Sequence, residues 1–369
     1  MTDDRLRILV VDDTVVYRKI VRDILDEMPD VEVVGTAHNG KAAMSRIATL
    51  KPDLLTLDIE MPEMNGIEVL ERIKEVSPGL GAIMLSTLTQ RGGDMTMKAL
   101  ELGAFDFISK PQEGSMEENK TLIKNAISPM LKAFKRLKDV RGILGGAAAG
   151  TRPVRPSAGT GEVRRVRPVA LQPKTKSEII AIGVSTGGPN ALAGMLPMIP
   201  GDIGAPILIV QHMPPVFTQS LARSLDAKCA IEVREAKDGE SLEPSTAVIA
   251  PGGKHMKIVA AADGKTRIIR ITSDPPENSC RPSVDYLFRS VAHHYVGRST
   301  GVIMTGMGAD GTLGLRLMKR SGSATIAQDE ATSVVYGMPM EAFKSGAVDI
   351  VAPLDRIASE IVKTVRGRK

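Results

Sequence analysis

The stretch LRILVVDD at residues 6–13 decides the fold of the first part of the chain. It is a short, mostly apolar run that ends in two acids, which is typical of a buried parallel strand. Apolar residues recur at helical spacing over the next segment, 14–28, so the strand leads into a helix. The sequence therefore predicts a βα unit whose strand delivers Asp12 and Asp13 at its carboxyl end.

The same alternation of strand and helix recurs along the chain to residue 140. Further strands are expected at 31–37, at the start of 52–62, at 81–87 and at 106–111, and helices at 40–50, 66–76, 94–104 and 116–140. Five βα repeats predict a doubly wound, flavodoxin-like α/β domain with a parallel sheet. We assign this domain to residues 1–125.

The segment after these repeats differs in composition. A length of 369 residues favours two domains. Between 141 and 176, Gly, Ala, Pro and Arg dominate and no apolar periodicity remains, so we assign 126–176 to a terminal helix and a flexible linker. The segment 141–176 carries eight Lys and Arg residues and one acid, so its net charge of +7 exceeds the +5 of the whole chain. We interpret it as a solvated tether and expect no binding to nucleic acid.

The βα alternation resumes in residues 177–369. Strands are expected at 178–185, 205–212, 247–252, 299–307, 324–329 and 347–353, with shorter strand-like runs at 257–261 and 267–272. Helices are expected at 189–199, from about 215, at 283–295, at 311–322 and at the C-terminal end. This pattern predicts a second doubly wound α/β domain with a mainly parallel sheet.

Composition excludes several classes of protein. The two cysteines, Cys229 and Cys280, lie outside any CxxC pair, so neither a metal or redox motif nor a disulfide framework is expected. The N-terminal MTDDRLRILVVDD is acidic and lacks an extended apolar segment, which argues against a signal peptide. No apolar run reaches the roughly 18 residues of a membrane span. We expect a monomeric, cytoplasmic protein that does not insert into membranes.

Three carboxylates and a lysine stand at strand ends of the first domain. Asp12 and Asp13 end the first strand, Asp58 the third, and Lys110 the fifth. Because the carboxyl ends of parallel strands meet at one edge, we expect these groups to lie together. Clustered carboxylates repel one another unless a cation lies among them, and Mg²⁺ prefers oxygen ligands. The arrangement suits phosphoryl transfer to Asp58, with Lys110 pairing the phosphoryl group.

The second domain contains G-x-S-x-G at Gly183, Ser185 and Gly187, between an expected strand and an expected helix. A serine on such a turn is raised above the sheet edge near a helix N-terminus that can stabilise an oxyanion. Glycine-rich turns of this kind also bind phosphate, and the motif alone leaves the two readings equally open.

The remaining strand ends favour the hydrolase reading. His212 ends the next strong strand and Asp310 follows the strand at 299–307, so a base and its orienting acid can join Ser185 at one edge. A phosphate loop would need neither group. The order Ser, His, Asp differs from that of the α/β-hydrolases, so membership of that fold is not inferred. His255 is a competing base and a candidate neighbour of the substrate.

The motifs VVDD, LTLDIEMPEMNG, MLST and DFISKP closely resemble the receiver domains of response regulators. The resemblance implies that a histidine kinase of the CheA type phosphorylates Asp58, with Asp13 a direct ligand of Mg²⁺ and Asp12 beside it. It also implies that the backbone carbonyl of Glu60 binds the metal. The hydroxyl of Ser86 or Thr87 and the side chain of Phe107 would shift when Asp58 is phosphorylated.

Six further motifs, GVSTGGPNAL, VQHMP, APGGKHM, NSCRPSVDYLF, TGMGADG and QDEATSVVYGMP, are similar to the chemotaxis protein-glutamate methylesterases, the CheB family. The resemblance implies hydrolysis of glutamate γ-methyl esters on the cytoplasmic helices of chemoreceptors, with release of methanol, and deamidation of receptor glutamines. It also implies that Thr186 and Met307 lie near the oxyanion, that hydrolysis needs no cofactor, and that phosphorylation of the receiver activates the enzyme.

Two other functions remain open from the residues alone. One is a receiver joined to a nucleotide-binding module, with Ser185 in a phosphate loop. The other is a DNA-binding regulator that uses the basic linker. The chain has no recognisable helix-turn-helix or zinc motif, and a tether without a folded reader binds DNA only weakly.

Overall fold

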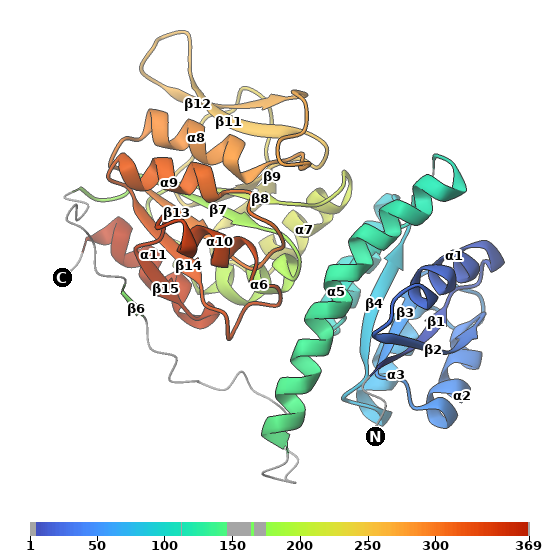
Figure 1. Cartoon of the computed structure of the whole chain (residues 1–369). Helices are drawn as coiled ribbons and strands as arrows, with labels where there is room; N and C mark the ends of the chain where they lie inside the picture. Colours follow the sequence, from blue (N-terminus) through green and yellow to red (C-terminus); the bar gives the residue numbers. More distant parts are fainter. Residues whose placement is uncertain (1–4, 112, 146–163, 166–174, 368–369) are drawn as a thin grey trace. The chain divides into compact units, whose positions relative to one another are not determined.

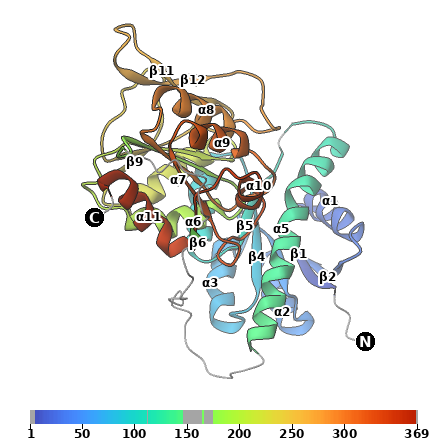
Figure 2. The ribbon, with the colours of Figure 1, turned by 60° about the vertical axis from the view of Figure 1, so that its left-hand side comes forward.

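The structure is a computed structural model that describes residues 5–111, 113–145, 164–165 and 175–367. The chain divides into two compact units, residues 1–148 and 149–369. Each unit is built around a sheet flanked by helices (Figures 1 and 2). In the described part of the chain, no helix is long and apolar enough to cross a membrane.

The first unit alternates strands and helices throughout. Its strands are β1 (Leu6–Val11), β2 (Val31–Ala37), β3 (Leu54–Asp58), β4 (Gly81–Ser86) and β5 (Asp106–Ser109). Its helices are α1 (Val15–Asp26), α2 (Gly40–Leu50), α3 (Gly66–Val76), α4 (Gln90–Glu101) and α5 (Met116–Gly145). The strands form a parallel sheet in the order β2-β1-β3-β4-β5. The strand order reverses at β1, so the crevice used for ligands in doubly wound sheets opens at the carboxyl ends of β1 and β3.

Helices cover both faces of this sheet. α1 packs against α5, while α2 packs against α3 and α3 against α4. α5 continues past residue 125, where the sequence places the end of the domain. Ile127, Met130 and Phe134 of this helix are buried in the same apolar core as β1 and α1. The part of this helix that lies beyond residue 125 therefore packs into this unit at least as far as Phe134.

The second unit contains a larger sheet and a separate hairpin. Its strands are β6 (Arg164–Arg165), β7 (Ile179–Val184), β8 (Ile207–Gln211), β9 (Glu232–Glu235), β10 (Thr246–Ile249), β11 (His255–Ala260), β12 (Arg267–Thr272), β13 (Ser299–Ile303), β14 (Ala324–Gln328) and β15 (Ile350–Ala352). Its α-helices are α6 (Gly188–Met195), α7 (Phe217–Asp226), α8 (Val284–His294), α9 (Thr312–Arg320), α10 (Met338–Lys344) and α11 (Leu354–Arg366). The sheet order is β6-β15-β14-β13-β7-β8-β10-β9, and all neighbours are parallel except β6 and β15.

The strand order of this sheet also reverses, at β7. The chain runs from β7 to β8 on one side and places β13 on the other side. The carboxyl ends of these three central strands therefore meet at the switch point of the sheet. The two topologies confirm the predicted fold class, two doubly wound α/β units.

Helices again form layers on the two faces. α8 packs against α9, and α9 against α10, while α6 packs against both α7 and α11. The antiparallel hairpin β11–β12 lies beside α8 (Figure 1). Three elements were not expected from the sequence, β6, β9 and α10. β9 reads EVRE and α10 has seven residues, so neither gives a clear apolar period.

Most of the predicted linker, 141–176, lies outside the described residues. Of the described part, 141–145 complete α5, and β6 pairs with β15 at the edge of the second sheet. The flexibility of the remainder stays a prediction.

Candidate functional site

The carboxyl end of β7 places Ser185 on the turn into α6. Its backbone N–H donates to the carbonyl of Thr305, 2.9 Å away, which ties the turn to the loop after β13. Gly187 then adopts a φ of 73°, a conformation that favours glycine. A Cβ at Gly188 would lie 2.0 Å from the side-chain oxygen of Gln211, so the turn also needs glycine there. The serine is half-buried at the sheet edge, as G-x-S-x-G predicts.

Gln211, at the end of β8, and Thr305, in the loop after β13, support this turn. The side-chain amide of Gln211 donates to the carbonyl of Ser185 (3.0 Å) and to that of His212 (3.1 Å). The hydroxyl of Thr305 donates to the carbonyl of Thr186 (2.9 Å). Buried hydrogen bonds of this kind fix the backbone on both sides of the serine.

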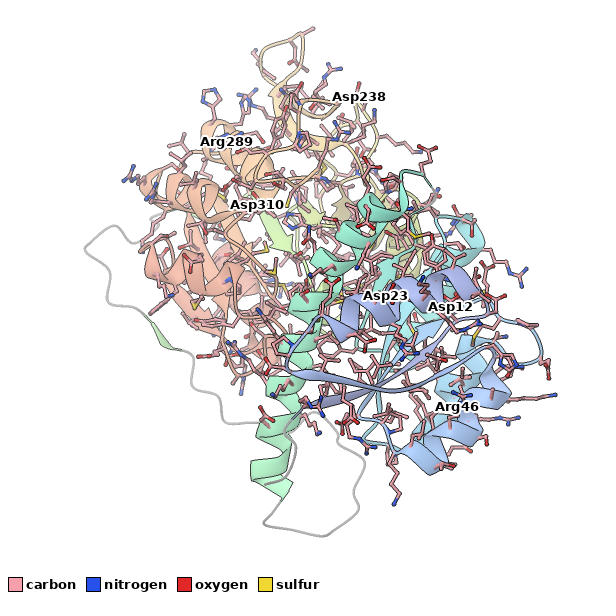
Figure 3. The ribbon with its side chains drawn as sticks, turned by 45° about the vertical axis from the view of Figure 1, so that its right-hand side comes forward. Asp12, Asp23, Arg46, Asp238, Arg289 and Asp310 are labelled. Carbon is pink, nitrogen blue, oxygen red and sulfur yellow. The ribbon has the colours of Figure 1, made fainter. Side chains whose placement is uncertain are left out.

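His212 follows β8 directly and lies beside Ser185, because Val184 and Gln211 are paired in adjacent parallel strands. Its ring Nε2 lies 2.8 Å from Oδ2 of Asp310. Asp310 belongs to the loop between β13 and α9 (Figure 3). The structure therefore brings together the three residues that the sequence placed at strand ends, Ser185, His212 and Asp310.

The carboxylate of Asp310 sits at the N-terminus of α8. It accepts from the backbone N–H groups of Val284 (2.7 Å), Asp285 (3.1 Å) and Gly311 (3.0 Å). Two side chains also donate to it, Ser283 through its hydroxyl and Asn278 through its amide. Burial alone would raise the pKa of Asp310, but its hydrogen bonds, with His212 foremost, lower the pKa to about 2. Asp310 is therefore ionised at every physiological pH.

An ionised Asp310 fixes the proton on His212. Because the carboxylate accepts only, Nε2 of the ring must carry hydrogen, which leaves Nδ1 as the basic nitrogen. The sulfur of Cys280 lies 3.7 Å from Nδ1. Burial lowers the pKa of His212, but hydrogen bonds with Asp310 and then Cys280 outweigh burial and raise the pKa to about 9.

His255, the competing base, is fully buried outside this cluster. Its Nδ1 accepts from the N–H of Ser283 (3.3 Å), and its Nε2 lies 3.1 Å from the carbonyl oxygen of Pro275. The ring also stacks on Tyr286 with a centroid distance of 4.4 Å. Both nitrogens are thus occupied by the segment that precedes α8, so the geometry favours a supporting position for His255.

Thr186 and Met307 are both close to Ser185, one through the chain and one through space. Thr186 is the next residue in the turn and is half-buried. Met307 is 52% exposed and follows Gly306, where a Cβ would lie only 2.7 Å from that of Ser185. The loop that carries Met307 therefore borders the serine directly.

The second site lies at the carboxyl edge of the first unit's sheet. Asp12 and Asp58 are buried there, and Nζ of Lys110 lies 2.7 Å from a carboxylate oxygen of each (Figure 3 labels Asp12). The ring of Tyr17 lies 4.9 Å from the same nitrogen. One carboxylate oxygen from each of Asp12, Asp58 and the exposed Asp13 lies within 4.8 Å of the others.

This cluster carries more negative than positive charge. Burial raises the pKa of Asp58 to about 6; Lys110 opposes the rise, and Asp12 and Asp13 add to it. Three carboxylates of this kind are the hard oxygen ligands that Mg²⁺ prefers, and a divalent cation would remove the repulsion between them. The donor set therefore fits Mg²⁺.

The predicted switch residues lie at the end of β4, just after it, and on β5. The Ser86 hydroxyl is buried; it accepts from Thr96 (2.7 Å) and donates to the carbonyl of Gly92 (3.2 Å), both in α4. The Thr87 hydroxyl instead donates to the Glu60 carboxylate (2.9 Å). The backbone N–H of Glu60 lies 3.4 Å from Oδ1 of Asp58. Phe107 is buried on β5.

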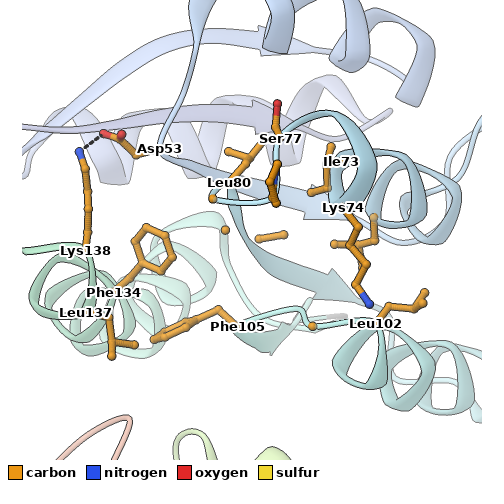
Figure 4. A pocket seen from close by; sticks show the side chains of 16 residues that line it. Asp53, Ile73, Lys74, Ser77, Leu80, Leu102, Phe105, Phe134, Leu137 and Lys138 are labelled. Carbon is orange, nitrogen blue, oxygen red and sulfur yellow. Dashed lines mark ion pairs between the residues drawn. The ribbon is translucent and has the colours of Figure 1, made fainter. Parts of the chain in front are cut away.

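A cavity of about 650 Å³ opens at the opposite edge of this sheet (Figure 4). Phe105, Phe134 and Leu80 line it, and Asp53 and Lys138 form an ion pair at 2.8 Å on its rim. It lies at the amino ends of β3 and β4, so it is separate from the carboxylate cluster.

The sequence did not single out Asn278, Ser283 or Cys280 as members of the hydrolase site. Ser283 had a detectable signal, because it is the N-cap residue of α8, where serine is favoured. Asn278 and Cys280 lie in an irregular segment, and periodicity gives no information about where such side chains point.

Two family models match the chain. CheB methylesterase matches residues 180–361, and the response regulator receiver domain matches residues 8–120. A protein-glutamate methylesterase/protein-glutamine glutaminase of Desulfotalea psychrophila is 58% identical over 362 residues, 98% of this chain and 99% of the relative. The chain belongs to the protein-glutamate methylesterase/protein-glutamine glutaminase family. This confirms the resemblance inferred from the sequence motifs.

Other members of the family match over a similar length. The protein of the same name from Geobacillus kaustophilus is 43% identical over 98% of this chain and 99% of its own length. Among solved structures, the CheB methylesterase catalytic domain of Thermotoga maritima is 39% identical, covers 51% of this chain and 99% of its own, and has a TM-score of 0.49.

Proposed function

We propose that the second unit hydrolyses glutamate γ-methyl esters on the cytoplasmic helices of chemoreceptors and also deamidates receptor glutamines. The observation that carries the proposal is the gathering of Ser185, His212 and Asp310 at the switch point of the sheet, with His212 bound to Asp310 at 2.8 Å. Membership of the methylesterase family supports the choice of substrate.

The reaction follows from the roles of these three side chains. Oγ of Ser185 attacks the ester carbonyl, and Nδ1 of His212 takes its proton while Asp310 stabilises the imidazolium. The imidazolium returns the proton to the leaving oxygen, so methanol departs and an acyl-enzyme remains. Water, deprotonated by Nδ1, then releases the glutamate side chain and frees Ser185. A glutamine amide releases ammonia by the same route, and hydrolysis requires no cofactor.

The hydroxyl of Ser185 makes no hydrogen bond to His212 in the part of the chain that the structure describes. Catalytic hydrogen bonds often tighten only when substrate binds. We assign the contact between Ser185 and Nδ1 to the enzyme–substrate complex. Backbone at Thr186 and in the loop of Met307 borders the serine and is positioned to face the developing oxyanion.

The first unit is proposed to be the switch for this activity. Asp58 accepts a phosphoryl group from a histidine kinase of the CheA type, and Lys110 pairs the phosphoryl oxygens. Asp12, Asp13, Asp58 and the carbonyl of Glu60 would hold Mg²⁺, which neutralises phosphoryl charge when bound. The hydroxyl of Ser86 is the better candidate for the switch, because it can exchange its bonds to α4 for one to the phosphoryl group.

The proposed cellular compartment follows from the proposed substrate. A cytoplasmic enzyme meets both the receptor helices and the kinase, and a reducing compartment suits the two free cysteines. We propose a monomer that neither binds nucleic acid nor inserts into membranes.

The activity is tested by measuring methanol release from membranes that contain methylated receptors. Wild-type protein should release methanol, and Ser185→Ala should lower the rate at least a thousandfold. Ser359→Ala, on α11, is the matched control and should retain the wild-type rate. Full activity in Ser185→Ala would refute the nucleophile and restore the phosphate-loop alternative.

Regulation is tested with a small phosphodonor and Mg²⁺. The donor should raise the rate of wild-type protein and leave that of Asp58→Asn at its value without donor. Equal activation of both proteins would show that the switch does not act through Asp58.

A further inference from the structure

One four-residue turn contacts both members of the His212–Asp310 pair. Glu277 and Cys280 close it with two backbone hydrogen bonds, from the Glu277 N–H to the Cys280 carbonyl (3.1 Å) and the reverse (2.9 Å). The central residues, Asn278 and Ser279, have φ values of 52° and 62°. Two successive positive φ values define a type I′ turn, which favours Asn and Gly and strains Ser. A strained conformation at this position indicates that the surroundings hold the turn.

The turn is anchored outside the reacting groups. Arg289 of α8 pairs with the Glu277 carboxylate through two guanidinium nitrogens (Figure 3 labels Arg289). The carbonyl of Arg281, just after the turn, accepts from the N–H of Gly253 (3.1 Å). The amide of Asn278 donates to Asp310 (2.9 Å) and to Asp285 (3.0 Å). These contacts leave the turn little freedom to move away from the pair.

The same turn presents the thiol of Cys280 to the basic nitrogen of His212. The sulfur lies 3.7 Å from Nδ1, within hydrogen-bonding range for sulfur, while Asp310 holds Nε2 at 2.8 Å. Nδ1 is the nitrogen that must receive the Ser185 proton. In the described part of the chain, Ser185 makes no hydrogen bond to this nitrogen. Of the residues that the structure describes, Cys280 and not Ser185 is therefore the one within hydrogen-bonding range of Nδ1.

We propose that Cys280 is a positioning residue for the hydrolysis reaction, whose sulfur holds the protonated ring of His212 at Nδ1 until substrate brings Ser185 into contact. This inference rests on the proposed function of the second unit. The sulfur accepts the Nδ1 hydrogen and so favours the charged form of the ring. Together with Asp310, it keeps His212 oriented and protonated before substrate binds.

The consequence is that Cys280 changes the pKa of His212, the base of the reaction. The titratable groups that face the ring are Asp310, from the loop after β13, and Cys280, from the turn before α8. Both raise the pKa of His212, and removing Cys280 should lower it. A lower pKa leaves more neutral base at pH 7, so the loss of this side chain should increase activity at neutral pH. A purely structural role predicts the opposite, a loss of activity at every pH.

The decisive measurement is the pH profile of kcat/KM on methylated receptor membranes. In Cys280→Ala the acid limb should shift to lower pH by about half a unit to one unit, which raises kcat/KM at pH 7 about three- to tenfold. Above pH 9 the kcat/KM of Cys280→Ala should equal that of the wild-type protein. The acid limb of Cys280→Ser should lie between those of the wild type and Cys280→Ala, because a hydroxyl on a shorter bond reaches Nδ1 less well. Cys229→Ala is the matched control and should keep the wild-type profile.

A second measurement does not depend on activity. Titration of isotope-labelled histidines by NMR gives the pKa of His212 in the full chain, and His212→Gln identifies its signal among the five histidines. The pKa should fall in Cys280→Ala and stay unchanged in Cys229→Ala. An unchanged pKa together with an unshifted pH profile would overturn the inference. Failure of the proposed function would instead appear as full methanol release by Ser185→Ala, and the NMR result would be unaffected.

Discussion

The two sites lie at equivalent edges of two doubly wound sheets, yet burial has opposite outcomes for their carboxylates. Asp58 in the first unit is surrounded by two other carboxylates and a single lysine, and its pKa is raised to about 6. Asp310 in the second unit faces His212 and several N–H donors, and its pKa is lowered to about 2. Burial acts on both in the same direction, so the neighbours decide which form of the acid is stable.

The difference separates a carboxylate cluster that suits a cation from a carboxylate whose partners all come from the protein. The cluster around Asp58 fits a divalent cation and a phosphoryl group, both of which change its charge balance. The carboxylate of Asp310 already has its hydrogen-bond partners from α8 and the turn at 277–280. A switch needs the first kind of site, and a preorganised catalytic pair needs the second.

The largest effect is expected from removing the charge of Asp310. Asp310→Asn keeps the shape of the side chain but no longer fixes the Nε2 hydrogen of His212 or stabilises the imidazolium. We expect kcat for methanol release to fall about 10⁴-fold, as for other Ser-His-Asp hydrolases. Asp263→Asn, in the exposed turn of the β11–β12 hairpin, is the control. A fall of less than tenfold in Asp310→Asn would contradict the role of the pair.

The next effect concerns the pH dependence of the base. His212 must be neutral to accept a proton, and its pKa is about 9. Below that value the protonated fraction grows, so kcat/KM should rise about tenfold per pH unit from pH 7 and level off above pH 9. Initial rates at low substrate concentration give this profile. A plateau that begins below pH 7 would show that the ring is neutral in the free enzyme.

Much of this comparison was accessible from the sequence. Asp58, Ser185 and His212 each end a strongly apolar strand, and the topology of parallel sheets brings such ends together. The order of the strands then places them at the two switch points. To predict that these residues meet, it is enough that the strands are parallel and adjacent.

The groups that tune the sites could not be predicted in the same way. Asn278 and Cys280 lie in a turn without periodicity, and their contacts depend on two positive φ values. His255 follows a glycine-rich turn and was a competing base, but the structure buries it against Pro275 and Ser283. Its position depends on how the segment before α8 folds back, which no local pattern encodes.

A smaller effect is expected from one of these supporting contacts. Asn278→Ala removes one of the hydrogen bonds to Asp310 and leaves the others in place. Because a hydrogen bond to a charged group contributes about 1.5 kcal/mol or more, kcat should fall about tenfold. Ser279→Ala in the same turn is the matched control, since the side chain of Ser279 is exposed. Equal losses in both variants would assign the effect to the turn conformation.

The smallest effect is expected from adding Mg²⁺ to the carboxylate cluster around Asp58. Mg²⁺ at ten times its dissociation constant should stabilise the first unit by about 1.4 kcal/mol, or a few degrees in its thermal midpoint. The second unit, whose carboxylate is already satisfied, should not respond. Calorimetry of the full chain that resolves two transitions measures both responses at once, and Asp13→Ala should abolish the shift of the first. Stabilisation of the second transition would mean that the cation binds beside His212 as well, and the contrast between the two edges would then fail.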